Sequence, residues 1–299
     1  WQIGHEIRFR NFGKLYSESS IDSFYQNNFL NQSVTNDSVW YQRWNNKFFV
    51  QWDGFLKAAK QPKIKTSFAI ASGYDYLDYK LDSIQLHNEG MLSQKRNRYS
   101  ECSIVFSRAD FKISAYARNS FVDNENNNLP RNNNYSMKVG FRGEGSNMGA
   151  ILYFEEELEK SRQNIIDRFY YSNHFIWFNQ FPSEEVNRYS VGISDIGRRY
   201  FLSGEWSNAK NYFYNTESAV PAYYDKTFNY YSVMAQGNLK WRSWHLDNKI
   251  IWQKSENDNV LHLPEWRTGH SLYIEKLFFK KALIARIGTD VTYTSSYYA

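Results

Sequence analysis

The sequence has little of the material from which several classes of protein are built. One cysteine, Cys102, stands in 299 residues, which excludes an internal disulfide framework and any zinc or iron–sulfur site that needs several cysteines. No apolar run approaches the roughly 20 residues that a membrane helix needs, which excludes a helical membrane protein. A large excess of one charge is also missing, because 36 basic residues face 31 acidic ones. The basic residues are scattered, so we expect no nucleic-acid partner.

Aromatic side chains are plentiful, and many lie in alternating segments. Phe, Tyr and Trp make up 19% of the chain, although its mean hydropathy is only −0.69. Apolar and polar residues alternate over stretches of about ten residues, as they do in a strand with one apolar face. The alternation predicts about 13 strands, within residues 1–10, 44–52, 64–73, 100–107, 111–119, 135–142, 148–155, 187–195, 199–207, 228–238, 244–253, 268–276 and 283–293.

The connections between these segments are alternately short and long. Such sidedness is typical of outer-membrane barrels, which have short periplasmic turns and long external loops. The sequence therefore predicts an all-β, antiparallel up-and-down transmembrane β-barrel, with residues 1–299 as a single barrel domain. Its short connections are expected near 56–63, 108–110, 143–147, 196–198, 239–243 and 277–282, and its long ones at 11–43, 74–99, 120–134, 156–186, 208–227 and 254–267.

Two neighbouring stretches interrupt the rhythm. Residues 169–180 look like a strand, but one more crossing would move every later loop to the wrong side of the membrane. We therefore place 169–180 outside the membrane, as an extended part of a long loop. The charged stretch from Glu155 to Gln163 predicts a short exposed helix just before it.

The odd number of strands carries a further expectation. Single-chain bacterial barrels have even numbers of strands, and a barrel must close because an open edge in lipid leaves backbone groups unpaired. The alternation is already under way at Trp1 and still runs near Ala299. We therefore expect a segment of a longer chain, incomplete at both ends.

The two parities of the strands predict two different surfaces. Aromatic rings near strand ends on the apolar parity are typical of the girdles that mark membrane interfaces. The predicted girdle consists of Trp44, Trp52, Trp206, Trp244, Trp252, Tyr189, Tyr200, Tyr231 and Tyr293. The polar parity, which predicts the lumen, carries the basic residues Arg8, Arg10, Lys47, Lys65, Lys112, Arg118, Lys138, Arg142, Arg188, Lys249 and Arg286, and the acidic residues Glu6, Glu101, Glu155, Glu205, Asp247, Glu275 and Asp290.

Residues that carry chemistry are sparse. His245 and Asp247 share the lumen parity and are the best candidate for an acid–base pair, but a hydrated polar wall explains them more simply. No nucleophile motif, dinucleotide fingerprint or metal-ligand spacing is complete. We therefore expect no catalytic residue, no metal and no cofactor, and a protein that is not an enzyme.

Several segments resemble the β-barrel porin family of Bacteroidota outer membranes. These are Tyr171 to Trp177, Trp244 to Asn248, Val260 to Pro264, His270 to Leu283, and Gly288 onward to Ala299. The likeness is good across 170–299 and diffuse before it, and it rests on the order and spacing of the segments. It implies an outer-membrane location in a Gram-negative bacterium and a porin-like protein, without naming a solute.

Three functions compete at this point. The first is a channel for passive diffusion of small hydrophilic solutes, with an anion preference set by a basic wall of Lys112, Arg118, Lys138 and Arg142. The second is a barrel that does not conduct and serves as a structural or interaction subunit of a larger outer-membrane complex. The third is a soluble sugar-binding β-protein, which predicts no consistent sidedness of loops. The first two hypotheses, in which the protein is a barrel, imply contact with outer-membrane lipid and lipopolysaccharide.

Overall fold

The computed structural model describes residues 1–19, 29, 35–56, 64–81, 94–108, 111–123, 133–145, 150–161, 165–195, 197 and 199–297. Its main element is a sheet of 13 antiparallel strands in which neighbours in sequence are neighbours in space. These strands are β1 (Gln2–Glu18), β2 (Thr35–Leu56), β3 (Ile64–Leu81), β4 (Gln94–Arg108), β5 (Phe111–Asp123), β6 (Asn133–Gly145), β7 (Ala150–Ser161), β10 (Glu184–Asp195), β11 (Tyr200–Asn215), β12 (Pro221–Trp241), β13 (Trp244–Ser255), β14 (Trp266–Phe278) and β15 (Leu283–Thr294).

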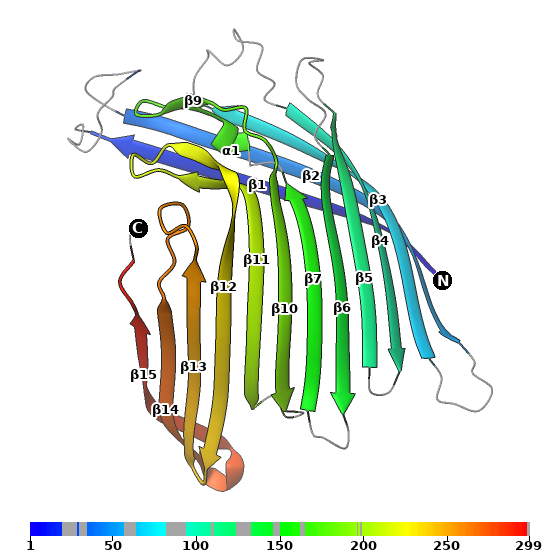
Figure 1. The fold of residues 1–299 in the computed structure, drawn as a ribbon, viewed down its shortest axis with the longest axis vertical. Coiled ribbons are helices and arrows are strands. Elements are labelled where there is room, and N and C mark those ends of the chain that lie inside the picture. Colours follow the sequence, from blue (N-terminus) through cyan, green and yellow to red (C-terminus); the bar gives the residue numbers. More distant parts are fainter. Residues whose placement is uncertain are drawn as a thin grey trace.

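The sheet curves into an open half-cylinder, with β1 and β15 at its two edges among the described strands (Figure 1). Every pair of adjacent strands is antiparallel, and the C-terminal ends of β2, β4, β6, β10, β12 and β14 all lie at one end of the sheet. The predicted fold class, strand number and sidedness are therefore confirmed. Within the described ranges, no helix is long and apolar enough to cross a membrane.

The strands extend further toward the long connections than the alternation predicted. β2 begins at Thr35, although its alternation is visible only from 44, and the connection predicted at 208–227 shrinks to 216–220. The reason is that both faces of a strand are polar once it leaves the apolar band. The period of two then disappears from the sequence, although the backbone ladder continues.

The helix predicted from Glu155 to Gln163 is wrong. β7 continues as a strand to Ser161 and pairs with β6 on one side and β10 on the other. Two ladders satisfy the backbone of this charged stretch, whereas an exposed helix this short would be marginal in water. The helix in this region is α1 (Ile165–Arg168), which has four residues.

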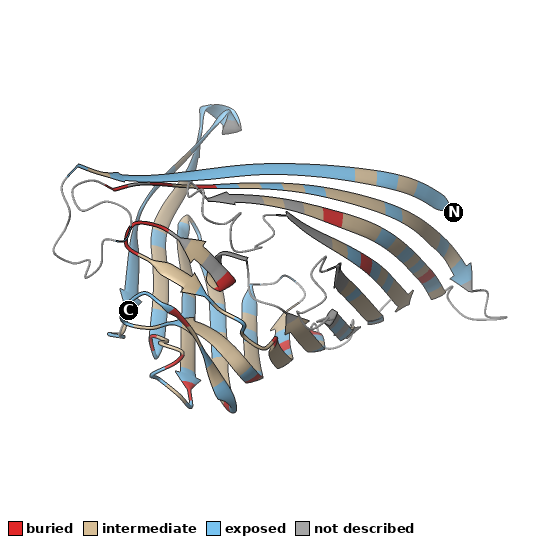
Figure 2. Cartoon of the chain, turned by 90° about the horizontal axis from the view of Figure 1, so that it is seen from above, coloured by how far each residue is buried: buried red, intermediate tan, exposed pale blue. Residues whose placement is uncertain are grey.

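Residues 169–180 do lie outside the main sheet, as predicted. β8 (Phe169–Tyr171) and β9 (Ile176–Phe178) pair with each other as a separate two-stranded sheet. Seen from above, this short hairpin lies inside the curve of the main sheet (Figure 2).

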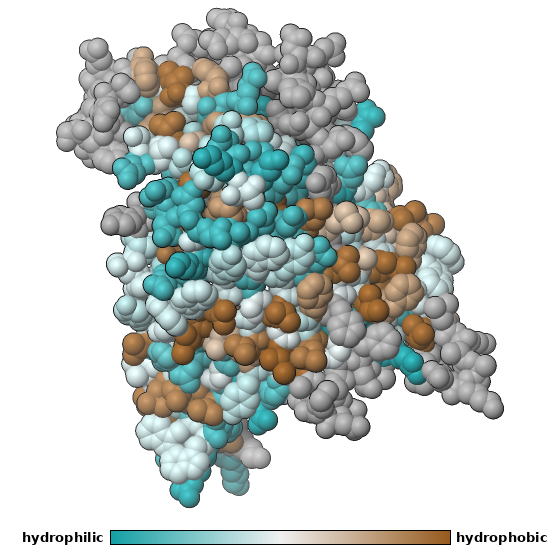
Figure 3. Space-filling model, in the orientation of Figure 1, coloured by the Kyte–Doolittle hydropathy of each residue, from teal (hydrophilic) through white to brown (hydrophobic). Residues whose placement is uncertain are grey.

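The two faces of the curved sheet differ in polarity. Large apolar side chains are exposed on the outward parity, for example Ile3 at 84%, Phe48 at 62% and Ile287 at 80%. On the face shown in Figure 3, hydrophilic side chains gather toward the end with the long connections, and patches of hydrophobic side chains lie below them. Exposed apolar area of this extent marks a surface that meets lipid or a partner. A soluble sandwich would bury these residues between two sheets, and the structure has one large sheet.

A small apolar core lies at the end with the long connections. Ala209 and Phe228 share the inward parity of β11 and β12, and Val260 from the β13–β14 connection packs on them. Residues 256–265 therefore fold inward over the concave face at that end.

Candidate functional site

The strand register places all the predicted lumen residues on the concave face. Neighbours across the ladder share a face, and the chain of pairs from Arg8 opposite Asn45 to Glu275 opposite Arg286 keeps one parity throughout. This concave wall is the candidate functional site. The part of these residues in solute selection stays a prediction.

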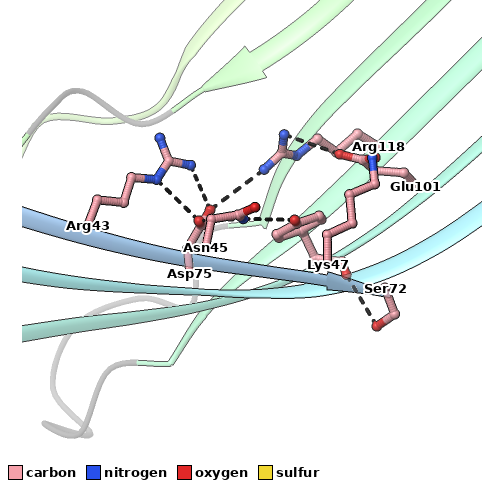
Figure 4. Close-up of polar contacts among 8 residues, drawn as sticks. Arg43, Asn45, Lys47, Ser72, Asp75, Glu101 and Arg118 are labelled. Atoms are coloured by element: carbon pink, nitrogen blue, oxygen red, sulfur yellow. Dashed lines mark hydrogen bonds and ion pairs between the residues drawn. The ribbon is translucent and has the colours of Figure 1, made fainter. Parts of the chain in front are cut away.

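Asp75 is the centre of a network of hydrogen bonds and ion pairs on the wall (Figure 4). The residue is only 4% exposed, and its carboxylate accepts two hydrogen bonds from Arg43, at 3.1 Å from Nε and 2.8 Å from Nη2. Asn45 Nδ2 donates a third hydrogen bond at 2.7 Å, and Arg118 Nη2 lies 3.8 Å away. Paired guanidinium donors of this kind hold a carboxylate in a fixed orientation.

Tyr99 and Glu101 extend this network along β4. Asn45 also donates to the Tyr99 hydroxyl at 2.8 Å, and the Arg118 guanidinium lies over the Tyr99 ring at 4.3 Å from its centroid. Glu101 binds Lys47 and lies 3.3 Å from Arg118 Nη1. The ring needs the glycine opposite it, because a Cβ at Gly73 would come within 2.2 Å of the Tyr99 Cζ.

A small hollow of about 110 Å³ opens beside this network, and most of the charged side chains that line it are basic. It is formed by Glu6, Arg8, Arg10, Arg43, Asn45, Lys47, Tyr99, Glu101 and Arg118. Arg10 stands directly opposite Arg43 across the β1–β2 ladder, a like-charge arrangement that opposes stability. Among the described residues Arg10 has no hydrogen-bond or ion-pair partner, so its charge is directed to the hollow.

The predicted basic wall on β5 and β6 has acidic neighbours that sequence reasoning missed. Lys112 stands opposite Arg142, which does concentrate positive charge. Lys138, however, stands opposite Glu157 on β7. The predicted helix over this stretch leaves Glu157 and Glu159 out of the predicted lumen, whereas the structure places both on the concave face of β7. Asp75 and Arg43 were overlooked because both lie beyond the predicted strand ends. Alternation alone gave no signal for these positions.

The remaining predicted lumen residues are spread along the wall. Arg188 lies 2.9 Å from Glu157 and 3.3 Å from Glu205, which neutralises part of its charge. Arg286 binds Glu275 at 2.6 Å on the far edge of the sheet, and Lys249 is exposed on β13. The structure therefore brings Arg8, Arg10, Lys47 and Arg118 together and leaves the others dispersed.

His245 and Asp247 share the concave face, as their parity predicts, but the ring of His245 stacks on Tyr273 at 4.7 Å and 6°. No group of three potential metal ligands occurs within the described ranges.

The nine predicted girdle residues all lie on the outward parity. Tyr189, Trp206 and Tyr231 stand in one row across β10, β11 and β12, and the first two stack at 5.0 Å. Trp252 pairs across the ladder with Trp266, a girdle candidate that the sequence reasoning did not include. Trp52, Tyr200 and Trp244 lie toward the end with the short turns.

The hairpin between β7 and β10 reaches across the concave face. We call residues 165–183 the mouth hairpin. Its tip contacts the concave face of β1 and β2 at the end with the long connections: the Asn173 backbone N–H lies 3.1 Å from both carboxylate oxygens of Asp37, and His174 Nε2 lies 2.8 Å from Thr35 Oγ1. Four strands, β3 to β6, separate β2 from β7 in the sheet. The hairpin therefore crosses the interior of the curved sheet to make this contact.

Several solved structures have a similar fold. The copper transporter OprC matches with a TM-score of 0.63 at 9% identity, over 92% of this chain and 48% of that one. The pyoverdine receptor FpvA from Pseudomonas aeruginosa matches with a TM-score of 0.58 at 10% identity, over 97% and 51%. The ferric preacinetobactin receptor BauA from Acinetobacter baumannii matches with a TM-score of 0.55 at 9% identity, over 88% and 45%. This chain spans about half the length of each.

The fold and the two-faced sheet define a transmembrane β-barrel. The sequence profile of the family described as "Putative porin" matches residues 1–299, and the chain belongs to that family. Among curated proteins, none matches this chain.

Proposed function

We propose that this protein is an outer-membrane channel for passive diffusion of small hydrophilic solutes, with a preference for anions. The observation that carries the proposal is the concave wall, whose charged and polar side chains surround a hollow lined by five basic and two acidic residues. Hydrated walls of this kind admit polar solutes, and basic rings favour anions in pores.

The like-charge pairs on the wall support the anion preference. Arg10 faces Arg43 and Lys112 faces Arg142 across adjacent strands. Such pairs cost stability, and rules of strand pairing are broken mainly where function requires it. The acidic column of Glu155, Glu157 and Glu159 on β7 reduces the preference, so we expect a weak one. No catalytic step is part of this proposal. The outward apolar band and its aromatic rows would contact outer-membrane lipid and lipopolysaccharide.

Planar-bilayer recordings on the full-length protein test the proposal. We expect stable conductance steps and a reversal potential on the anion side in a salt gradient. The combined variant Lys112→Gln, Lys138→Gln and Arg142→Gln should shift the reversal potential toward cations. Its matched control, Lys210→Gln, Lys254→Gln and Lys276→Gln, removes the same charge from the outward parity and should leave the potential unchanged. Equal shifts in both variants would remove the case for the basic wall.

A barrel that does not conduct is the second candidate, and the mouth hairpin is the observation that favours it, because this segment covers part of the concave face. In that case the protein would act as a structural or interaction subunit of a larger outer-membrane complex. A folded, heat-modifiable protein without conductance would support this second function.

A further inference from the structure

We propose that the mouth hairpin is a fixed constriction which sets the largest solute that can enter the barrel, and that Asp37 is its main anchor. The inference deepens the proposed channel function and rests on it. It follows from where the hairpin is rooted, what its tip binds, and what lies beneath it.

The base of the hairpin is rooted beside β7 and β10. Asn179 N–H donates to the Arg168 carbonyl at 2.6 Å, and Asn179 Nδ2 donates to the Asp167 carbonyl at 3.1 Å, which closes the stem. Tyr170 and Trp177 stack across the two short strands at 4.8 Å. The segment is therefore a stiff hairpin and keeps its direction over its whole length.

The tip is a tight turn held by its own hydrogen bonds. Ser172 N–H donates to the Phe175 carbonyl at 2.9 Å, and Phe175 N–H donates to Ser172 Oγ at 3.0 Å. This turn leaves the Asn173 N–H free to donate to Asp37, as described above. This single N–H is shared between the two carboxylate oxygens of Asp37. The Asn173 side chain adds a second contact with β2, because its Nδ2 donates to Thr35 Oγ1 at 2.9 Å.

The contact is buried to a degree that loops seldom reach. Asn173 is 1% exposed, His174 5% and Asp37 9%. His174 Nε2 also lies 3.3 Å from Glu18, and its ring meets Tyr16 edge-on at 6.4 Å. Buried polar groups that are fully hydrogen-bonded specify one arrangement, because separating them costs their whole desolvation. This is why we infer a fixed constriction and not a loose flap.

The position of the tip determines what it controls. Tyr16 and Glu18 lie at the end of β1 with the long connections, whereas Arg10 of the hollow is six residues further down, roughly 20 Å along the strand. A solute that enters from the loop side therefore passes the hairpin before it reaches the charged wall. On the opposite side Val260 packs inward on Ala209 and Phe228, which narrows the same entrance.

The test compares Asp37→Ala with Asp53→Ala in the full-length protein. Asp53 is a matched control because it lies on the same strand and the same face, but at the other end, where it accepts from Gln51 at 2.8 Å. In bilayers, Asp37→Ala should raise single-channel conductance at least twofold and let larger polyethylene glycols enter. Asp53→Ala should behave as the unaltered protein. No change in Asp37→Ala, or equal changes in both variants, would overturn the proposal.

A second readout does not need conductance. The variant Arg10→Cys, in a Cys102→Ser background, is reacted from the loop side of intact cells with maleimide–polyethylene glycol of increasing mass. Asp37→Ala should at least double the mass of the largest reagent that reacts. If the protein does not conduct but this shift occurs, the channel function fails and the constriction stands. Unchanged labelling would overturn the constriction.

A crosslink tests whether the hairpin is fixed. Thr35→Cys with Asn173→Cys, in the same background, joins two side chains that already touch. The oxidised protein should keep the size limit of the unaltered protein, because the hairpin is already in place. A smaller limit after oxidation would show a moving gate and overturn the fixed constriction.

Discussion

The polar contacts of the mouth and those of the wall connect different parts of the chain. On the wall, Asp75 binds Arg43 and Asn45 of the adjacent strand β2 and lies 3.8 Å from Arg118, two strands away on β5. Arg118 keeps 34% of its side chain exposed. At the mouth, Asp37 of β2 binds the backbone of a segment that follows β7, with four strands between β2 and β7, and the groups that meet are almost fully buried. The wall therefore stays open to water and solute, whereas the mouth contact closes a gap and leaves nothing for a solute to bind.

The largest effect is expected on the wall. Asp75→Ala removes the acceptor of Arg43 and Asn45 and leaves a half-buried guanidinium without its carboxylate. Loss of one partner of such a pair should cost about 3 kcal/mol in the free energy of unfolding. Urea unfolding in lipid vesicles measures it. The control is Asp53→Ala, because Asp53 is exposed and lies on the neighbouring strand β2. This variant should lose less than about 0.5 kcal/mol in the free energy of unfolding. A similar loss in both variants would show that the network around Asp75 adds no more stability than an exposed surface charge.

A smaller and more local effect is expected at the mouth. Asp37→Ala should leave the free energy of global unfolding within about 1 kcal/mol, because the hairpin lies outside the main ladder. Hydrogen exchange at the Asn173 and Phe175 amides should become about tenfold faster or more, since the tip loses its anchor. If exchange accelerates equally in the strands β1 and β2, the mouth and wall form one cooperative unit and the contrast between them is lost.

A pH dependence is expected near the root of the hairpin. Glu184 lies five residues to the loop side of Tyr189, outside the apolar band, and burial together with the charge of Glu159 raises its pKa to about 7. A raised carboxyl pKa stabilises the fold while the group is protonated. Stability should therefore fall as pH rises from about 4.5 to 7 and then level off, by about 1 kcal/mol for a partly exposed group.

This pH dependence of stability is checked by measuring the free energy of unfolding at pH 5 and at pH 8. Glu184→Gln should remove the difference between the two, and Glu185→Gln, the neighbour whose carboxylate binds Lys160 at 2.6 Å, should keep it. A difference that persists in Glu184→Gln would assign the dependence to another group.

The smallest effect is expected at the short turns. Arg242 occupies the left-handed region, with φ at 56°, in the two-residue connection from β12 to β13. Arg242→Gly should relieve this strain and stabilise the fold by about 0.5 kcal/mol, after loss of its contact with the Trp241 ring. Ser243→Gly should give no gain in the same unfolding assay, because Ser243 is not in that region. A gain in both would show that the left-handed conformation of Arg242 is not the source of the gain.

The separation of faces was readable from the sequence. Ile3, Ile7 and Phe9 alternate with polar residues, and lipid on one side and water on the other impose a period of two on any strand between them. The same reasoning correctly kept 169–180 out of the main sheet. It failed for 155–161, because Glu157 and Glu159 pair with β10 and β6, and a charged strand that is polar on both faces shows no period.

The sequence by itself determined the class of fold, the number of strands, and which residues face the lumen, because each of these follows from local alternation and from the lengths of connections. Only the tertiary structure decided which charges neutralise each other and what covers the mouth. Asp75 with Arg43, and Asp37 with Asn173, join residues 32 and 136 positions apart. Such contacts depend on the register and the curvature of the whole sheet, and no local pattern in the chain records them.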